Sequence, residues 1–336
     1  MLKNETVDGK AVKKPNADCI CKKYGMQKRV IITGGAGYVG ASLVEVLQAD
    51  DRVQEIVVYD CLIRNDRRFF FAEKESFGLS KVRFVQGDIL DTRKLSAACA
   101  GMDVLVHLAA FVDEPYNHSQ HIQYDQVNAF GTMSVVRAIE ETPTIRKVVH
   151  LSSTAVYGFR KEIHPSDKPN PQNGYAISKY RGELFLEGLS QGNNALDLKT
   201  LRSGHIHGCN RVMRYDTLVH AFLFEATTGG LVQIHGNGEQ IRSFVALHRV
   251  AAALAIEVFE DHFEHGSVLA DFQCDVNRIL TWLQSRMGQI EYRYLTPAIK
   301  HPSQSFQGLP GIDEPSMDAT LQAFQDSFVL SGLGKQ

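Results

Sequence analysis

Tyr175 and Lys179 stand four residues apart in Tyr175-Ala-Ile-Ser-Lys179, so a helix would place both side chains on one face. A tyrosine with a pKa of about 10 is a poor base at neutral pH, but a lysine ammonium within about 4–6 Å can lower that pKa by 1–3 units. Tyr175 could then exchange a proton with a hydroxyl that is oxidised. A serine hydroxyl from the preceding run Leu151-Ser-Ser-Thr-Ala-Val-Tyr-Gly158 could orient the same oxygen. Because this spacing also occurs by chance on many helices, the upstream sequence has to support the interpretation.

A glycine-rich turn supplies that support. Val30 to Ile32 form a short β-branched run, and Gly34, Gly37 and Gly40 follow within eight residues of Thr33. The first two glycines allow a tight turn and close approach of the backbone to phosphate, and the third lets the next helix pack closely. The N-terminus of that helix offers unpaired N–H groups to an anion. The segment therefore predicts a seat for a dinucleotide pyrophosphate.

Asp60 indicates which dinucleotide is preferred. It ends a second apolar run, Glu55 to Tyr59, roughly 20 residues after the last glycine. A carboxylate there can accept hydrogen bonds from ribose hydroxyls and would repel a 2′-phosphate, which favours NAD over NADP. Arg64, Arg67 and Arg68 follow closely and could accommodate a phosphate, so NADP stays open.

Strand-like and helix-like stretches alternate from Arg29 onward, which predicts a parallel sheet with helices on both faces. Further strands are expected at 82–86, 104–108 and 147–151, and a long helix at 123–141. Ligands of such sheets bind beyond the carboxyl ends of the strands. Ser152-Ser-Thr and Asp60 both stand at such ends.

Composition limits the class of protein. The chain has 336 residues, 44% of them hydrophobic, and a net charge of −2, so nothing drives it toward nucleic acid or anionic membranes. The six cysteines lack a paired CxxC spacing, which predicts reduced thiols in a cytoplasmic protein without a metal site. No apolar run approaches the roughly 18 residues that span a bilayer. Residues 1–27 are rich in lysine without apolar periodicity and are expected to be a mobile extension.

Several motifs in this order resemble the extended short-chain dehydrogenase/reductase superfamily, and within it the NAD-dependent sugar-nucleotide epimerase/dehydratase family that includes UDP-glucose 4-epimerase. The motifs are Thr33-Gly-Gly-Ala-Gly-Tyr-Val-Gly40, Gly87-Asp-Ile89, His107-Leu-Ala-Ala110, Asn128 with Gly131-Thr132, Ser152-Ser-Thr-Ala-Val-Tyr-Gly158, Tyr175 with Lys179, and Leu201-Arg202. They extend over most of the chain that is expected to fold.

The resemblance implies roles for individual residues. Asp88 and Ile89 would contact the adenine, Leu108, Ala109 and Ala110 would line the cofactor cleft, and Lys179 would also hold the nicotinamide ribose. The catalytic serine or threonine of the family corresponds to Ser153, which would also touch the substrate, and Tyr175 would shuttle the proton. The expected cofactor-binding residues are Gly34, Gly37, Tyr38, Val39, Gly40, Asp60, Asp88, Ile89, Leu108, Ala109, Ala110, Asn128, Tyr175 and Lys179.

The chain departs from the family pattern on the substrate side. Where dehydratases carry an Asp-Glu pair it has Thr154-Ala155, which disfavours 4,6-dehydration because no acid is present to protonate a leaving hydroxyl. His205 stands where an asparagine commonly meets the substrate nucleotide. Arg242 survives where the family clamps a diphosphate, a role that suits the guanidinium fork. The usual pattern is missing at 111–116 and 243–249.

The expected fold is α/β, a Rossmann-type doubly wound parallel sheet with a smaller C-terminal substrate domain. The NAD-binding domain would take residues 28–201, with the chain returning near 240–260, and the substrate domain 202–239 and 261–336. The expected function is epimerisation of a nucleotide sugar through a transient ketone, by a homodimer. Two alternatives stay open, a nucleotide-sugar 4-keto reductase or other NAD(P)-linked oxidoreductase, and a non-catalytic NAD-binding sensor or scaffold.

Overall fold

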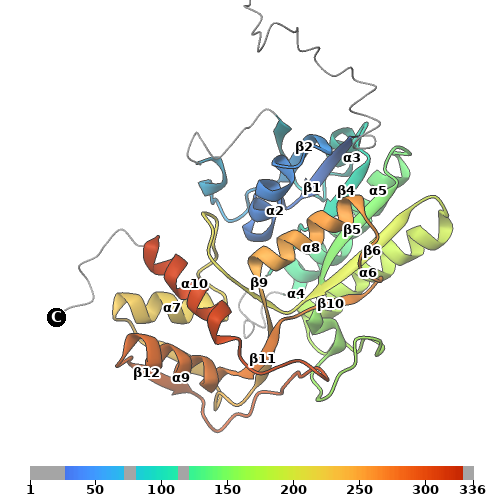
Figure 1. Cartoon of the computed structure of the whole chain (residues 1–336). Helices are drawn as coiled ribbons and strands as arrows, with labels where there is room; N and C mark the ends of the chain where they lie inside the picture. Colours follow the sequence, from blue (N-terminus) through green and yellow to red (C-terminus); the bar gives the residue numbers. More distant parts are fainter. Residues whose placement is uncertain (1–26, 72–80, 113–120, 328–336) are drawn as a thin grey trace, which may run out of the picture.

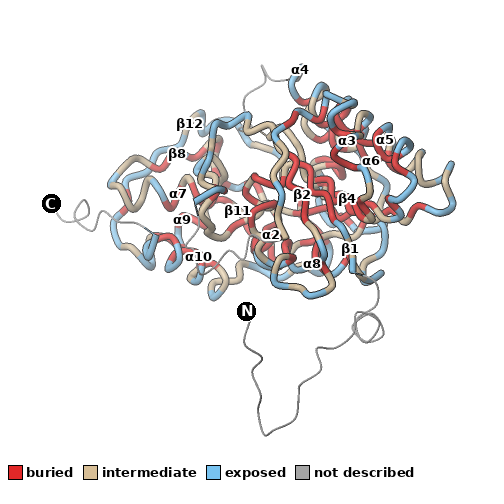
Figure 2. The backbone as a smooth tube through the Cα atoms, turned by 90° about the horizontal axis from the view of Figure 1, so that it is seen from above, coloured by how far each residue is buried: buried red, intermediate tan, exposed pale blue. Residues whose placement is uncertain are grey.

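The computed structural model describes residues 27–71, 81–112 and 121–327. Residues 1–26, nearly all of the extension expected at 1–27, and most of the 111–116 segment therefore lie outside the described residues. In the described part, burial is concentrated in the strands and in the inward faces of the helices (Figure 2).

Seven parallel strands form the main sheet, with β1 near its middle (Figure 1). In spatial order they are β10 (Ser267–Leu269), β6 (Asp197–Ser203), β5 (Lys147–Ser153), β4 (Val104–His107), β1 (Lys28–Thr33), β2 (Val53–Asp60) and β3 (Val82–Gln86). The five strands expected from sequence are present, with ends shifted by at most two residues at each side. The order reverses between β1 and β4, and in doubly wound sheets the crevice at this reversal binds the ligand.

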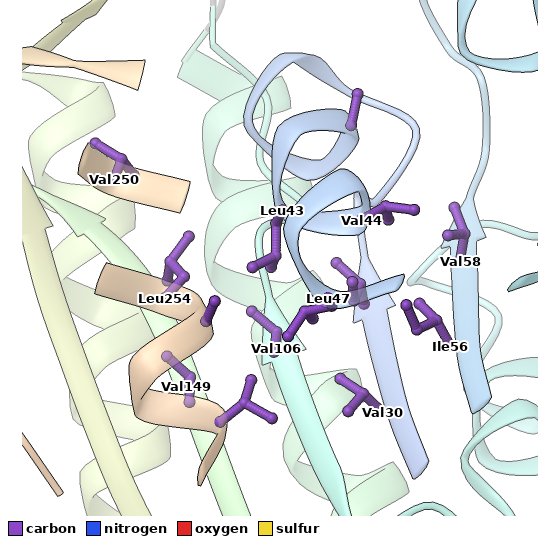
Figure 3. Close-up of a cluster of buried hydrophobic side chains, with 14 of the residues drawn as sticks. Val30, Leu43, Val44, Leu47, Ile56, Val58, Val106, Val149, Val250 and Leu254 are labelled. Carbon is purple, nitrogen blue, oxygen red and sulfur yellow. The ribbon is translucent and has the colours of Figure 1, made fainter. Parts of the chain in front are cut away.

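Helices cover both faces of the sheet. The two on one face are α2 (Tyr38–Gln48) and α8 (Leu247–Phe259), and those on the other face are α3 (Thr92–Cys99), α5 (Gly131–Glu140) and α6 (Gly174–Gly192). Figure 3 shows how Leu43 and Leu47 of α2, together with Leu254 of α8, pack on strand side chains such as Val106. The doubly wound α/β architecture expected from sequence is confirmed.

The helix expected at 123–141 contains a feature that sequence did not predict. It begins as α4 (His121–Gln123), continues as a π-helical stretch η4 (Tyr124–Phe130) and becomes α-helical in α5. Such π-helical insertions occur mostly at functional sites. Here the stretch carries Asn128, which faces the end of β4.

The rest of the chain builds a smaller part with its own apolar core. A three-stranded sheet has the order β11 (Phe272–Asp275), β9 (Ile241–Ala246), β7 (His205–His207), and a two-stranded one pairs β12 (Tyr292–Leu295) with β8 (Val232–His235). Around them lie α7 (Leu218–Thr228), α9 (Val276–Met287) and α10 (Glu314–Asp326) (Figure 1). The chain returns to the main sheet through both α8 and β10, so the return reaches Leu269 rather than ending near 260.

Candidate active site

The glycine turn after β1 is shaped to receive an anion. Gly34 has a φ of +70°, and a Cβ there would lie 2.6 Å from the backbone nitrogen of Ala109, so only glycine fits between the ends of β1 and β4. Gly37 begins α2 without a side-chain cap, and the first turn of this helix carries no acidic residue. The N–H groups of Tyr38, Val39 and Gly40 open this helix, where a phosphate is stabilised by the helix dipole. The turn therefore fits a dinucleotide pyrophosphate.

Tyr38 contributes its backbone to that turn, while its side chain serves another purpose. The Tyr38 hydroxyl donates to the carbonyl of Gly208, and the Nδ2 of Asn210 donates to the Tyr38 carbonyl at 2.8 Å. The ring also packs edge to face on His220, with centroids 5.5 Å apart. Tyr38 thereby joins the glycine turn to the smaller part of the protein.

Asp60 lies at the carboxyl end of β2, next to the turn. Its carboxylate accepts from the N–H of Ala36 at 3.1 Å and from the N–H of Leu62 at 2.8 Å. Burial raises the pKa of Asp60, and the two N–H groups oppose this rise. Arg64 and Arg68 are paired elsewhere, with Asp216 at 3.1 Å and with Asp66. The Asp60 carboxylate therefore lies beside the glycine turn. This arrangement favours NAD over NADP.

Asp88 and Ile89 follow β3 with opposite exposures. Asp88 is exposed, and its carboxylate accepts from the N–H of Leu90 at 2.9 Å. The side chain of Ile89 is buried, and it occupies the space that a Cβ on Gly131 would need. Of these two side chains, that of Asp88 is the exposed one that could meet an adenine.

Asn128 fixes the segment that continues from β4. Its Oδ1 accepts from the N–H of Phe111 at 2.7 Å, and its Nδ2 donates to the Phe111 carbonyl at 3.0 Å and to the Ser178 hydroxyl at 3.1 Å. Leu108 to Ala110 lie directly before this clamp and are partly buried. The π-helical stretch thus positions the predicted wall of the cofactor cleft.

Ser153 and Tyr175 are brought together from β5 and α6. The Ser153 hydroxyl accepts from the N–H of Ala155 at 3.2 Å, and its proximity to Tyr175 lowers the pKa of the tyrosine. The Tyr175 ring packs on Tyr124 with centroids 5.8 Å apart. A hydroxyl and a phenol therefore converge at the carboxyl end of the sheet, where one substrate oxygen could contact both.

The predicted effect of Lys179 on the pKa of Tyr175 stays a prediction. Burial raises the pKa of Tyr175, and the groups that pull it back are Ser153 and the charge of Arg214. The Lys179 ammonium instead donates to the Leu151 carbonyl at 2.9 Å and lies 3.3 Å from Nε2 of His150. Burial lowers the pKa of Lys179 to about 8. The carbonyl of Leu151 thus anchors the Lys179 ammonium to β5.

Arg214 was missed as a site residue by sequence reasoning. Its guanidinium pairs with Asp216 at 2.8 Å and donates to the Val112 carbonyl at 3.3 Å, while Arg64 donates to the same carbonyl at 2.6 Å. Val112 directly follows the Phe111 backbone that Asn128 clamps. The effect of Arg214 on the pKa of Tyr175 could not be predicted from the spacing of the two residues in the sequence.

The two predicted substrate residues lie close enough to influence each other. Burial and the charge of Arg242 lower the pKa of His205 to about 4, so the imidazole is neutral at pH 7. Arg242 donates to the Pro302 carbonyl at 2.9 Å, and its guanidinium lies 5.5 Å from the centre of the Phe159 ring. The structure therefore places the Arg242 guanidinium near a neutral imidazole and an aromatic ring.

The part of the chain that the structure describes presents neither a metal cluster nor a membrane span. Within the described ranges, no three His, Cys, Asp or Glu side chains are grouped to hold a metal ion. No helix there is both long and apolar enough to cross a bilayer.

Comparison with known proteins places this geometry in context. Residues 30–264 match the NAD dependent epimerase/dehydratase family. A trifunctional UDP-glucose 4,6-dehydratase/UDP-4-keto-6-deoxy-D-glucose 3,5-epimerase/UDP-4-keto-L-rhamnose-reductase of Arabidopsis thaliana is 26% identical over 252 residues, 71% of this chain and 36% of the plant protein. The dTDP-D-glucose 4,6-dehydratase of Homo sapiens is 27% identical over 66% of this chain and 63% of the human protein. The chain thus spans about a third of the plant relative.

A solved structure shows the same fold. UDP-glucuronic acid 4-epimerase from Bacillus cereus, in complex with UDP-glucuronic acid and NAD, superimposes with a TM-score of 0.75 at 20% identity. The likeness covers 89% of this chain and 100% of the bacterial one.

Proposed function

The chain belongs to the NAD-dependent epimerase/dehydratase family, and from this premise we propose that it epimerises a nucleotide sugar through a transient ketone. The observation that carries the proposal is that Ser153 lies close enough to Tyr175 to lower the pKa of the phenol, at a strand end that lacks a carboxylic acid. A dehydratase needs an acid to protonate the departing hydroxyl. Thr154 and Ala155 supply none, although the human relative in the comparison is named a dehydratase.

The residues present fit the family's cofactor. The N-terminus of α2 with Gly34 and Gly37 would hold the pyrophosphate, Asp60 the adenosine ribose, and Asp88 the adenine. Lys179, Asn128 and the segment from Leu108 to Ala110 would face the nicotinamide end. Bound NAD supplies a hydride acceptor that can return the hydride.

The chain's own residues would handle the proton and the reacting oxygen. Tyr175, as phenolate, takes the proton of the sugar hydroxyl while the carbon loses its hydride, and it gives the proton back when the ketone is reduced. The Ser153 hydroxyl donates to the reacting oxygen and keeps it beside Tyr175. The keto sugar then rotates within the site. Reduction on its opposite face inverts the configuration of the oxidised carbon. Proton, hydride and charge are all restored at the end of the cycle.

Arg242 and His205 would bind the nucleotide diphosphate. A guanidinium matches the geometry of phosphate oxygens, and the neutral His205 can donate or accept one hydrogen bond without adding charge. Both belong to the three-stranded sheet of the smaller part, Arg242 on β9 and His205 on β7. The altered residues at this end are therefore expected to determine which sugar and nucleotide are accepted.

The test uses purified protein and a panel of nucleotide sugars. The expected result is a 4-epimer, formed without net conversion of added cofactor and without deuterium from heavy water on the sugar carbons. A Tyr175→Phe variant should bind the sugar and NAD but lose turnover. Steady oxidation of added NADH would indicate a reductase instead, and binding without turnover in native mass spectrometry would indicate a sensor or scaffold.

We also propose that the protein is a cytoplasmic homodimer. Large apolar side chains remain exposed on α4, η4, α5 and α6: Ile122, Phe130, Met133, Ile177 and Leu184. Exposed apolar groups on neighbouring helices are typical of a protein interface. The described cysteines, Cys61, Cys99, Cys209 and Cys274, are all free, which supports a reducing compartment.

A further inference from the structure

A segment in the C-terminal part of the chain lies against two features of the candidate site. One is the turn that follows Ser153 at the end of β5, here called the catalytic turn, and the other is Arg242. The Pro302 carbonyl accepts from Arg242 at 2.9 Å, and the Ser303 hydroxyl accepts from the N–H of Ile241 at 3.0 Å. Phe306 is buried and packs edge to face on Tyr157, with ring centroids 5.5 Å apart. Residues 302–306, here called the strap, therefore connect β9 with the turn that follows β5.

Gln304 is the residue of the strap that reaches the catalytic turn. It is only 5% exposed, and its Nε2 donates to the carbonyl of Thr154 at 2.7 Å and to the carbonyl of Gly158 at 2.8 Å. These two carbonyls stand at the beginning and just past the end of η5 (Thr154–Tyr157). One amide group thus bridges both ends of a single helical turn.

That turn sets the position of the Ser153 hydroxyl. Ser153 is the N-cap of η5, and its Oγ accepts from the N–H of Ala155. At the other end, Gly158 has a φ of +74°, and its N–H donates to the Ala155 carbonyl at 2.9 Å. A side chain would collide there with the Asn170 carbonyl, so the turn has little freedom to rearrange. Its remaining freedom is limited by the two bonds from Gln304.

We propose that Gln304 is a positioning residue for Ser153: by bridging the Thr154 and Gly158 carbonyls it holds the turn that aims the serine hydroxyl at the reacting oxygen. The inference rests on the proposed function for the identity of that oxygen. Gln304 does not touch the substrate in this scheme. It acts through the turn, and it links this turn by its own backbone to the strand that carries Arg242, since the N–H of Gln304 donates to the Ile241 carbonyl at 3.1 Å.

The test compares Gln304→Met with the matched control Gln273→Met. Gln273 donates from its Nε2 to the carbonyls of Phe306 and Leu309, so the control removes the same kind of bridge at the C-terminal end of the strap and leaves both bonds from Gln304 to η5 in place. For Gln304→Met, kcat should fall on the order of 10- to 100-fold with KM changed by less than about threefold, because the loss displaces a catalytic hydroxyl and leaves the diphosphate site intact. The control should stay within about threefold of wild type in both constants.

A second variant separates positioning from folding. In Gln304→Glu the ionised carboxylate cannot donate, whereas the neutral acid donates one hydrogen bond. Its kcat relative to wild type should therefore rise as the pH is lowered, while its unfolding transition stays cooperative. A KM increase with unchanged kcat, or equal losses in the Gln304→Met and Gln273→Met variants, would overturn the proposal.

Hydrogen exchange gives a readout that needs no substrate. Amides in a peptide covering 153–159 should exchange faster in Gln304→Met than in wild type, and the Gln273→Met variant should match wild type there. If wild type converts none of the nucleotide sugars, the proposed function fails and the exchange data alone decide whether Gln304 holds the turn. Unchanged exchange at 153–159 in Gln304→Met would overturn the inference even if the enzyme is an epimerase.

Discussion

The Lys179 ammonium lies 3.3 Å from Nε2 of His150, a residue of β5, and its second contact is the Leu151 carbonyl on the same strand. His150 is buried, and burial together with the charge of Lys179 lowers its pKa well below the usual value. The imidazole is therefore neutral and its Nε2 can accept from the ammonium. Lys179 is therefore anchored to β5 through both contacts.

Stability should depend on pH through Lys179. Its pKa is lowered from the usual 10.5 to about 8, so between these values the unfolded chain binds more protons than the folded one. The free energy of unfolding then rises with pH across this window, by at most about 1.4 kcal/mol per pH unit from this group. Urea unfolding of wild type and Lys179→Met at pH 7 to 10 should show this rise as a difference between them. If the free energy of unfolding changed with pH in the same way in both proteins, the prediction would be contradicted.

Arg214 should make Tyr175 easier to deprotonate. Its charge lowers the pKa of Tyr175, so Arg214→Met should raise that pKa. A phenolate base is then populated only at higher pH, and kcat/KM at neutral pH should fall about tenfold for each pH unit by which the pKa of Tyr175 rises. The pH profile of kcat/KM measures this change. Arg249→Met is the control, because Arg249 is exposed and pairs with Asp271; the same change in both pH profiles would refute a specific effect.

Asp60 should determine cofactor affinity. Hydrogen bonds to a charged group contribute about 1.5–3 kcal/mol, so Asp60→Asn is expected to weaken NAD binding roughly 10- to 100-fold. NADP should not gain strong binding, because Arg64 and Arg68 are held by Asp216 and Asp66. Titration calorimetry with both cofactors tests this. Asp66→Asn should leave NAD affinity unchanged, and a loss as large as that of Asp60→Asn would argue against the ribose role.

The oligomeric state should depend on the exposed face of η4, α5 and α6. Phe130 is 57% exposed on this face, and Phe130→Asp would place a charge inside a dimer interface. Light scattering after size-exclusion chromatography should give a dimer for wild type and a monomer for the variant. Phe71→Asp, at a phenylalanine that is 75% exposed elsewhere, should stay dimeric. If the wild-type protein were a monomer in this measurement, the proposed interface would be ruled out.

A buried ion pair should stabilise the junction of α6 and β6. Glu183 is fully buried and pairs with Arg202, which also donates to the Tyr157 hydroxyl at 2.9 Å. Removing one partner of such a pair leaves a buried charge alone and costs about 3–5 kcal/mol, so Glu183→Gln should lower the free energy of unfolding by that order. Glu141→Gln breaks an exposed pair with Arg137 and should lower the free energy of unfolding far less, because solvent screens exposed charges. If the Glu183→Gln and Glu141→Gln variants lost similar amounts of unfolding free energy, burial would not be what makes the Glu183–Arg202 pair important.

Much of the cofactor half was predictable because its signals are local. The glycines of the turn, Asp60 at the end of β2, and the apolar alternation of strands all depend on backbone geometry within short stretches of chain. The π-helical stretch around Asn128 was not predictable, since its apolar residues fit an ordinary helix equally well. β10 was missed because three residues carry too little periodicity to identify a strand.

The sequence by itself determined the family, the doubly wound sheet and the chemical types at the site, with Ser153, Tyr175 and Lys179 among them. Only the tertiary structure decided how those groups act on one another. Gln304 meets Thr154 from 150 residues away, and Lys179 donates to the Leu151 carbonyl of β5. Hydrogen bonds and charge effects depend on distances and burial between separate elements, and these quantities exist only once the chain has folded.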